Sequence, residues 1–519
     1  MADVQHKRGT RSDLNILAAA NGLLVGQVYF ITDEDRLSIA TSVSAYQAAA
    51  KEGEGGSLEL YAENPSSPTA PSATGSNAVA IGSGAVSSGF SSFSIGQGAD
   101  ATADQAIALG LNAQSTAVKA VSIFGDAGST LSTAIGQNST GLQAKTRTGA
   151  AAMALGGSYA SGTDSFAAAI ANNASSYGAT GANSIAVGQL AKATGTNAVA
   201  IGSGSTSSQE KSFSVMGGTA SGQYSMAFNN YSVSSGQKSI SLGWLTDATG
   251  ISSVAIGTGT QSSGLHSVSL GQAYASGADS FAAAIANSTS SYGATGANSV
   301  AMGYLAKASA SKSTSVGGDT SLASGGGSFA AGGEFPTASG AFAVALGGSV
   351  NTASGEASYA YGKRSLADKV GKYAYGAQLV GTSGATQAGM MVLVAATSDA
   401  TPKSLASNTN AAGTTNQIIL PNNSAYSFSG TIIARQDAAS GSNYASWEIK
   451  GALLRDANAA STVLGNGIIN KLFATAGATA WDIALTADTT NGGLAITATG
   501  AAAVNIRWVA TVNTSEVSF

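Results

Sequence analysis

A short repeat governs what this chain can fold into. Residues 77–84 return unchanged at 197–204, and a degenerate form recurs about every 14 residues, as at Ile81, Ile95 and Leu109. A short period kept over about three hundred residues is typical of a solenoid, in which each coil packs on the next. The repeat therefore predicts an elongated fold and argues against an enzyme.

The pattern within one repeat indicates how a coil is built. Strand alternation places Val79 and Ile81 on one face and Ala80 on the other, and Gly82 permits the reversal that follows. We expect the β-branched residues and an occasional Phe to be buried in each coil, with Ala and Ser forming a flat outer surface that packs against identical rods. Some twenty coils, stacked at about 4.8 Å, would give a rod roughly 100 Å long.

Composition excludes several classes of function. Only 10% of the residues are charged, the net charge is −4, and there are 68 Gly, 6 Pro, 2 His and no Cys. The absence of Cys excludes disulfides and thiolate metal sites. The distance in sequence between His6 and His266 argues against a zinc site or a Ser-His-Asp triad. We therefore expect no catalytic residues, no metal and no cofactor, and the lack of a basic block argues against nucleic acid as a partner.

Targeting signals are also missing from the sequence. Its start has no apolar core typical of a secretory signal, and no run of 18 apolar residues predicts a membrane-spanning helix. We expect synthesis in a cytoplasm and no insertion into a membrane.

Three segments flank or form the repeat region. Residues 1–62 form a small N-terminal segment, with a helix at 14–20 and strands at 27–31 and 36–40. A Pro-containing linker at 63–74 leads to the solenoid at 75–376, and a second linker follows at 377–385. Residues 386–519, here called the tip, are predicted to form an antiparallel β-sandwich of the jelly-roll type. Its expected strands are 390–395, 416–420, 424–434, 446–454, 481–486, 493–499 and 504–512.

The repeats at 77–84, 183–188 and 197–204 resemble the head repeat of trimeric autotransporter adhesins, the YadA-like heads. This resemblance implies a left-handed parallel β-roll and a homotrimer. An autotransporter also needs a secretion signal, a heptad stalk and a membrane anchor, and the sequence predicts none of them. In contrast, residues 7–10, 26–33 and 36–37 resemble the N-terminal piece of bacteriophage tail fibres.

The combined expectation is a phage tail fibre: a homotrimer located on the virion that binds a host surface receptor and performs no chemistry. Its partners would be tail or baseplate proteins at the N-terminus and a host glycan or protein at the C-terminus. Two alternatives stay open, a tailspike-type glycan depolymerase and a purely structural virion or appendage protein.

Candidate contact residues follow from this expectation. In the tip, Trp447, Trp481 and Trp508 alternate with apolar neighbours and are expected mainly in the core, so receptor contacts are expected in loops. The expected receptor-binding residues are Arg435, Asp437, Asn443, Tyr444, Arg455 and Asp456. The expected virion-attachment residues are Lys7, Arg8, Tyr29, Phe30 and Arg36.

Overall fold

The computed structural model describes residues 7–23, 28–32, 36–42, 45–48, 69–135, 145–146, 150–169, 177–284, 292–377, 381–439 and 441–519. Positions 63–68 of the expected first linker and 378–380 of the second lie outside the described residues. The chain divides into two compact units, residues 1–124 and 125–519, and each is considered by itself.

The first unit begins with a small α+β segment. Strands β1 (Lys7–Gly9), β2 (Val28–Ile31), β3 (Arg36–Ser42) and β4 (Ala45–Ala48) form a sheet in that order. Helix α1 (Arg11–Ala19) begins three residues earlier than the sequence predicts, because Thr10 and Asp13 form a capping box around its first turn. The core of this segment consists of Leu14, Ala18, Leu23, Tyr29 and Ile31.

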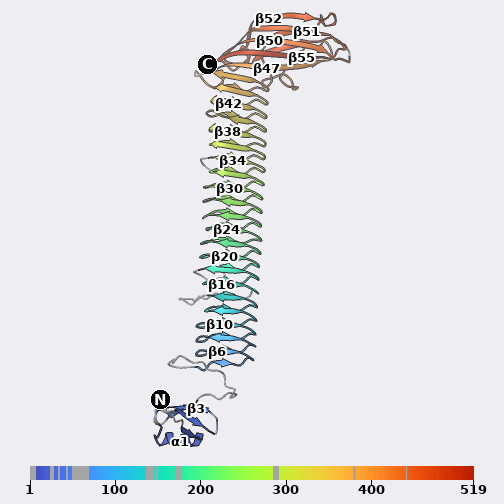
Figure 1. Ribbon diagram of the computed structural model, residues 1–519. Helices are drawn as coiled ribbons and strands as arrows, with labels where there is room; N and C mark the ends of the chain where they lie inside the picture. The colour runs from blue at the N-terminus through green and yellow to red at the C-terminus, as the bar shows by residue number, and fades with distance from the viewer. Residues whose placement is uncertain are drawn as a thin grey trace, which may run out of the picture. The chain divides into compact units, whose positions relative to one another are not determined.

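The same unit contains the first coils of the solenoid, and each complete coil supplies one long and one short strand (Figure 1). The long strands pair in parallel and in register, so that Val79 lies beside Phe93 and Phe93 beside Ile107. The long strands are β6 (Val79–Ile81), β8 (Phe93–Ile95), β10 (Ile107–Leu109) and β12 (Val121–Ile123). The short strands are β5 (Ser72–Ala73), β7 (Val86–Ser87), β9 (Asp100–Ala101) and β11 (Gln114–Ser115).

The second unit continues the same pattern, which confirms a parallel β-solenoid of about 20 turns. Its long strands are β14 (Thr133–Ile135), β16 (Met153–Gly156), β18 (Phe166–Ala169), β20 (Ile185–Val187), β22 (Val199–Ile201), β24 (Phe213–Val215), β26 (Met226–Phe228), β28 (Ile240–Leu242), β30 (Val254–Gly257), β32 (Val268–Gly271), β34 (Phe281–Ala284), β36 (Val300–Tyr304), β38 (Thr314–Asp319), β40 (Phe329–Ala331), β42 (Val344–Ser349), β44 (Tyr359–Lys363) and β46 (Tyr373–Ala377). Its short strands are β13 (Asp126–Ala127), β15 (Lys145–Thr146), β17 (Tyr159–Ala160), β19 (Gly178–Ala179), β21 (Lys192–Ala193), β23 (Thr206–Ser207), β25 (Thr219–Ala220), β27 (Val233–Ser234), β29 (Asp247–Ala248), β31 (Gln261–Ser262), β33 (Tyr274–Ala275), β35 (Gly293–Ala294), β37 (Lys307–Ala308), β39 (Leu322–Ala323), β41 (Thr337–Ala338), β43 (Thr352–Ala353) and β45 (Leu366–Ala367).

The interior of the coils is the reverse of what the sequence suggests. The expectation that β-branched residues fill the coil is wrong: Ala80 is 6% exposed, whereas Val79 is 38% exposed. Every long strand in the described coils directs an Ala or Ser inward from its second position. Because the coil is so narrow, its two sheets lie too close together for a larger side chain. The first and third positions of the long strands therefore form an apolar outer stripe, which includes Ile201, Ile256 and Met302.

Small residues also allow the coils to stack closely. A Cβ at Gly236 would overlap the carbonyl oxygen of Gly250 in the next coil. Inward Ser side chains bond to one another, as where the Ser207 hydroxyl donates to Ser214 Oγ at 2.8 Å. The turn glycines behave as predicted, since Gly82 has a φ of 115°. The core thus combines alanine contacts with serine hydrogen bonds.

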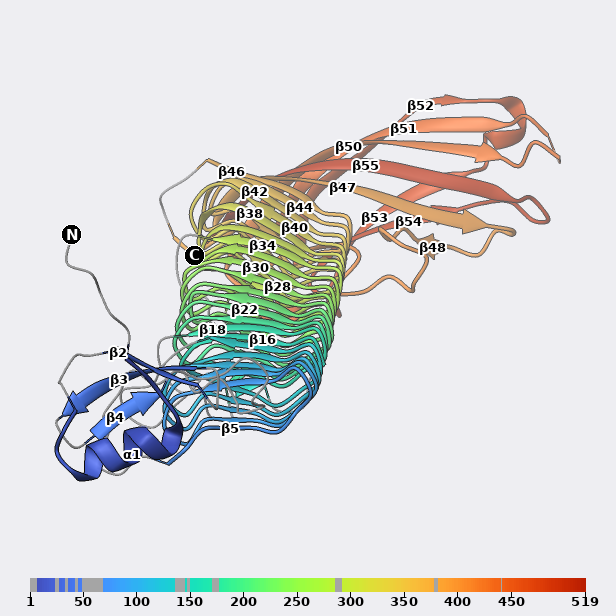
Figure 2. The same cartoon turned by 60° about the horizontal axis from the view of Figure 1, so that its bottom comes forward.

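The tip follows β46 and consists of two antiparallel sheets. The large sheet has the order β47-β55-β50-β51-β52, and β54 lies between β53 on one edge and β48 and β49 on the other (Figure 2). Two short 3₁₀ helices, Ala459–Ser461 and Ala476–Ala478, lie in the connections. The strands are β47 (Thr386–Thr397), β48 (Lys403–Ser404), β49 (Ile418–Ile419), β50 (Ser424–Gln436), β51 (Tyr444–Arg455), β52 (Val463–Ala474), β53 (Asp482–Asp488), β54 (Gly493–Thr499) and β55 (Ile506–Ser518).

One apolar core joins the two sheets. It contains Trp447 from β51, Trp508 from β55 and Ile496 from β54, and Trp481 lies against Trp508 with ring centroids 6.0 Å apart. All three tryptophans are fully buried, which confirms their expected core role. The tip is rooted on the solenoid because β47 pairs with β46, with Tyr373 beside Met390.

Candidate functional site

The end of the tip opposite its root carries a row of exposed side chains. The strand register places Arg507 of β55 beside Arg435 of β50, and Arg435 beside Tyr444 of β51. Strand β47 pairs with the last coil near Met390, and further along the same strand Ala396 lies beside Arg507. At about 3.4 Å per residue, this row lies roughly 20 Å along β47 from the root.

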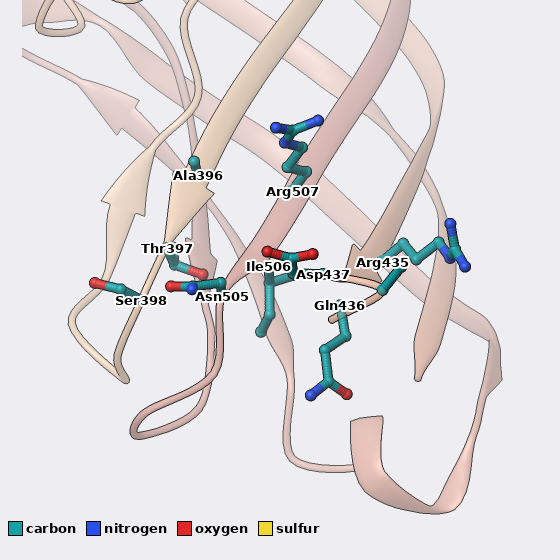
Figure 3. A pocket seen from close by; sticks show the side chains of 10 residues that line it. Ala396, Thr397, Ser398, Arg435, Gln436, Asp437, Asn505, Ile506 and Arg507 are labelled. Carbon is teal, nitrogen blue, oxygen red and sulfur yellow. The ribbon is translucent and has the colours of Figure 1, made fainter. Parts of the chain in front are cut away.

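A cleft of about 590 Å³ opens beside this row. Figure 3 shows Arg507, Arg435 and Asp437 around it, with Asn505 on the neighbouring connection. The Asp437 amide donates to the carbonyl of Asn505 at 2.8 Å, which fixes the hairpin end against the start of β55. Two of the expected receptor residues, Arg435 and Asp437, therefore line one cavity.

A second cleft, of about 260 Å³, adjoins the first. Ala396 and Arg507 line both clefts, and Lys403 lines the second, where its Nζ donates to the carbonyl of Ala396 at 3.1 Å. Hydrogen bonds from Thr401 lower the pKa of the nearby Asp399 below its usual value, so that carboxylate stays ionised. Arg507 is thus the charged side chain common to both cavities.

Aromatic and apolar side chains continue the exposed face toward the sheet edge. The rings of Tyr444 and Phe473 are stacked with centroids 5.0 Å apart. The adjacent register row contains Val394, Val509 and Ile433, each at least 36% exposed. A surface that combines cations with exposed aromatic and aliphatic groups is typical of recognition sites rather than of inert sheet faces.

The other expected receptor residues have different surroundings. Asn443 accepts a hydrogen bond from Thr475 Oγ1 at 2.9 Å and donates to Gln436 Oε1 at 2.8 Å, so it shapes the hairpin end. Arg455 and Asp456 lie at the opposite end of β51, near the root. Arg455 donates to the carbonyls of Leu420 and Gly492, which ties two connections of the tip together.

The expected virion-attachment residues all come from one small sheet. Arg8 lies 5.6 Å from the centre of the Phe30 ring, in a cation–π contact. Tyr29 is only 3% exposed and belongs to the core of this segment. Lys7 and Arg36 are the first residues of β1 and β3.

Sequence reasoning missed several features of this site, including Lys403 and Asn505 of the cleft walls. Arg507 was not selected, because it stands far from Arg435 in sequence and only the register brings them together. Strand β52 was not predicted, because its apolar residues do not alternate regularly; Ile468 and Ile469 are adjacent, as are Leu472 and Phe473.

Two properties of the described part of the chain bear on other functions. It holds no group of three or more His, Cys, Asp or Glu residues suited to a metal ion. Its helices include none long and apolar enough to cross a membrane.

Comparison with known families identifies the repeat. The family model of the YadA head domain repeat matches residues 73–99, 87–113, 179–205, 248–273 and 294–320. No curated protein matches the chain. The matched segments all lie in the coils and confirm the resemblance of residues 77–84, 183–188 and 197–204. The solenoid therefore carries YadA head domain repeats, and these repeats imply an adhesin-like function.

Proposed function

We propose that this chain is a homotrimeric bacteriophage tail fibre that attaches to a host surface receptor through its tip and makes or breaks no covalent bond. The proposal combines the adhesin-like repeats of the solenoid with the tail-fibre resemblance of the N-terminal segment. The observation that carries it is the position of the exposed row Arg507, Arg435 and Tyr444, at the end of the tip opposite its root.

The outer stripe of the solenoid supports association of chains. Each long strand leaves up to two apolar side chains partly exposed, among them Ile185, Met226 and Leu242 at 37%, 42% and 45%. When a neighbouring chain covers the exposed side chains of one coil, the free energy of association gains roughly 1–3 kcal/mol, since full burial of one large apolar side chain is worth about 1.5–3 kcal/mol. Summed over many coils, this stripe favours a permanent oligomer, and cyclic symmetry lets every chain bury the same stripe.

Three tips on one fibre would make attachment multivalent. When one tip is bound, the others stay at high local concentration near the same surface, so weak single contacts become lasting attachment. The N-terminal segment, with Lys7, Arg8, Phe30 and Arg36 on its sheet and Tyr29 in its core, would join the fibre to tail or baseplate proteins on the virion.

A binding experiment with the purified full chain tests this function. The chain should bind bacteria that the phage infects and reduce phage adsorption in proportion to its concentration, whereas a non-host strain should show neither effect. Failure to bind host cells or to compete would favour a purely structural protein. Loss of viscosity when the chain is incubated with host polysaccharide would favour a depolymerase and overturn the proposal.

A further inference from the structure

The two arginines at the far end of the tip form a like-charged pair. Arg435 and Arg507 lie directly opposite each other on antiparallel strands, and both are exposed. Within the part of the chain that the structure describes, no side-chain hydrogen bond or ion pair involves either guanidinium group. Like charges in this position destabilise a sheet, because opposed Cβ atoms lie about 4.5–5.5 Å apart. The two guanidinium groups point in different directions (Figure 3), and an oxyanion bound beside either one would offset this repulsion.

The charge around the pair is positive although the chain as a whole has a net charge of −4. Lys403 lines the second cleft together with Arg507, and it is the third cation of the two clefts after Arg435 and Arg507. Among the described residues that line the two clefts, the acidic one is Asp437, which lines the first. The carboxylate of Asp399, next to Ser398 of the cleft wall, already accepts from the Thr401 amide at 2.8 Å.

We propose that these adjoining clefts bind an acidic glycan, whose sugar carboxylates are held by Arg435 and Arg507. This inference rests on the proposed receptor-binding function and names the chemical class of the receptor. A guanidinium offers a planar fork of donors that matches a carboxylate with two parallel hydrogen bonds. Lys403 supplies a point charge in the second cleft, which suits the next acidic sugar of a chain.

The remaining groups of the site fit the rest of a sugar. The Asp437 carboxylate accepts hydrogen bonds from hydroxyl groups, and Asn505 both donates and accepts them. The stacked rings of Tyr444 and Phe473 give the sheet face an apolar platform beside Arg435, on which the CH face of a sugar ring packs. Nucleic acid shares the negative charge of such a glycan and is therefore the competing ligand to exclude.

Binding of the full chain to immobilised polygalacturonate tests the inference. The control surface is the same polymer after reduction of its carboxyl groups, and single-stranded DNA serves as a second polyanion. We expect binding to polygalacturonate that weakens with added salt, with little binding to the reduced polymer or to DNA. Equal binding to the reduced polymer, or stronger binding to DNA, would overturn the inference.

Charge-removing variants locate the site. Arg435→Gln and Arg507→Gln should each weaken binding about ten- to hundredfold, because a hydrogen bond to a charged group is worth about one to two powers of ten in affinity. Lys450→Gln is the matched control, since Lys450 is exposed on the same sheet face about 20 Å along β51 from Tyr444. Equal losses in all three variants would refute the site, provided that their melting temperatures match that of the parent.

Different results would overturn the acidic-glycan site and the receptor-binding function. A chain that binds host cells but ignores polygalacturonate, with cell binding unchanged in Arg435→Gln and Arg507→Gln, would overturn the acidic-glycan site alone. A chain that does not bind host cells at all would overturn the receptor-binding function itself.

Discussion

Lys372 and Glu516 form a buried ion pair between the last coil and the last strand of the tip. The Lys372 Nζ lies 2.8 Å from Glu516 Oε2, and the side chains are 6% and 2% exposed. Gln387 Nε2 donates to the same oxygen at 2.6 Å, and Thr514 Oγ1 donates to Oε1 at 2.7 Å. Lys372 directly precedes β46, so this pair anchors the tip to the solenoid at the point where β47 begins.

Removal of one partner should loosen this anchor. Lys372→Met leaves the Glu516 carboxylate buried without a cation, which should cost about 3–5 kcal/mol of unfolding free energy. The double variant Lys372→Met, Glu516→Gln removes both charges and should recover most of that loss. Chemical unfolding followed by tryptophan fluorescence measures both, because Trp447, Trp481 and Trp508 lie in the tip core. A single variant as stable as the parent would contradict the assigned role.

The serine core offers a matched pair of substitutions. Ser214 and Ser241 occupy the same inward position in β24 and β28, but only Ser214 has a side-chain partner, whereas the Ser241 hydroxyl is buried without one. Ser214→Ala should destabilise the coil by about 0.5–1.5 kcal/mol through the lost hydrogen bond with Ser207. Ser241→Ala should be neutral or stabilising. Thermal unfolding of both variants measures the difference, and the reverse order would contradict this description of the core.

The outer stripe should control association. Ile201→Glu together with Ile256→Glu places two charges on a surface that the proposed trimer buries, so the complex should dissociate into single chains. Sedimentation at several protein concentrations measures the change in mass. The control is Leu245→Glu, which alters an exposed turn residue outside the long strands. An unchanged mass in the double variant would show that the stripe is not the contact surface.

A cluster of tyrosines near the root predicts a pH effect. A hydrogen bond with Tyr361, followed by partial burial and by the charges of Tyr361 and Tyr359, raises the pKa of Tyr373 from 10.0 to about 12. The neutral phenol is therefore favoured in the folded chain, and its contribution to stability is complete below pH 10 and is lost as the pH rises through about 12. In a pH titration, the tyrosinate absorbance of Tyr373 should appear at a higher pH in the parent chain than in the variant Tyr361→Phe. Identical titration curves for the two proteins would contradict the contact between Tyr373 and Tyr361.

The fold was predictable where one local rule decides the structure. The 14-residue period predicted the solenoid, the Gly that follows many of the long strands predicted the turn, and the alternating tryptophans predicted the core of the tip. Hydrophobicity did not predict which side chains point into the coil, since Val79 and Ile81 are apolar enough to be expected in a core. Only the narrow spacing of the two sheets shows that Ala80 must point inward.

The candidate site was predictable only where its residues lie close together in the sequence. Arg435 and Tyr444 stand at the ends of one hairpin, so a loop-based expectation found both. Arg507 enters the site only through strand register, which no local pattern encodes. Arg455 seemed equivalent to Arg435 in sequence, but it lies at the root, where its guanidinium binds backbone carbonyls.

Imaging of phage particles labelled with an antibody against the tip shows which end of the fibre meets the host. We expect three parallel chains in each fibre, with the N-terminal segment at the virion and the label at the free end. A label next to the virion, or its absence from fibres that contain this chain, would contradict this expectation.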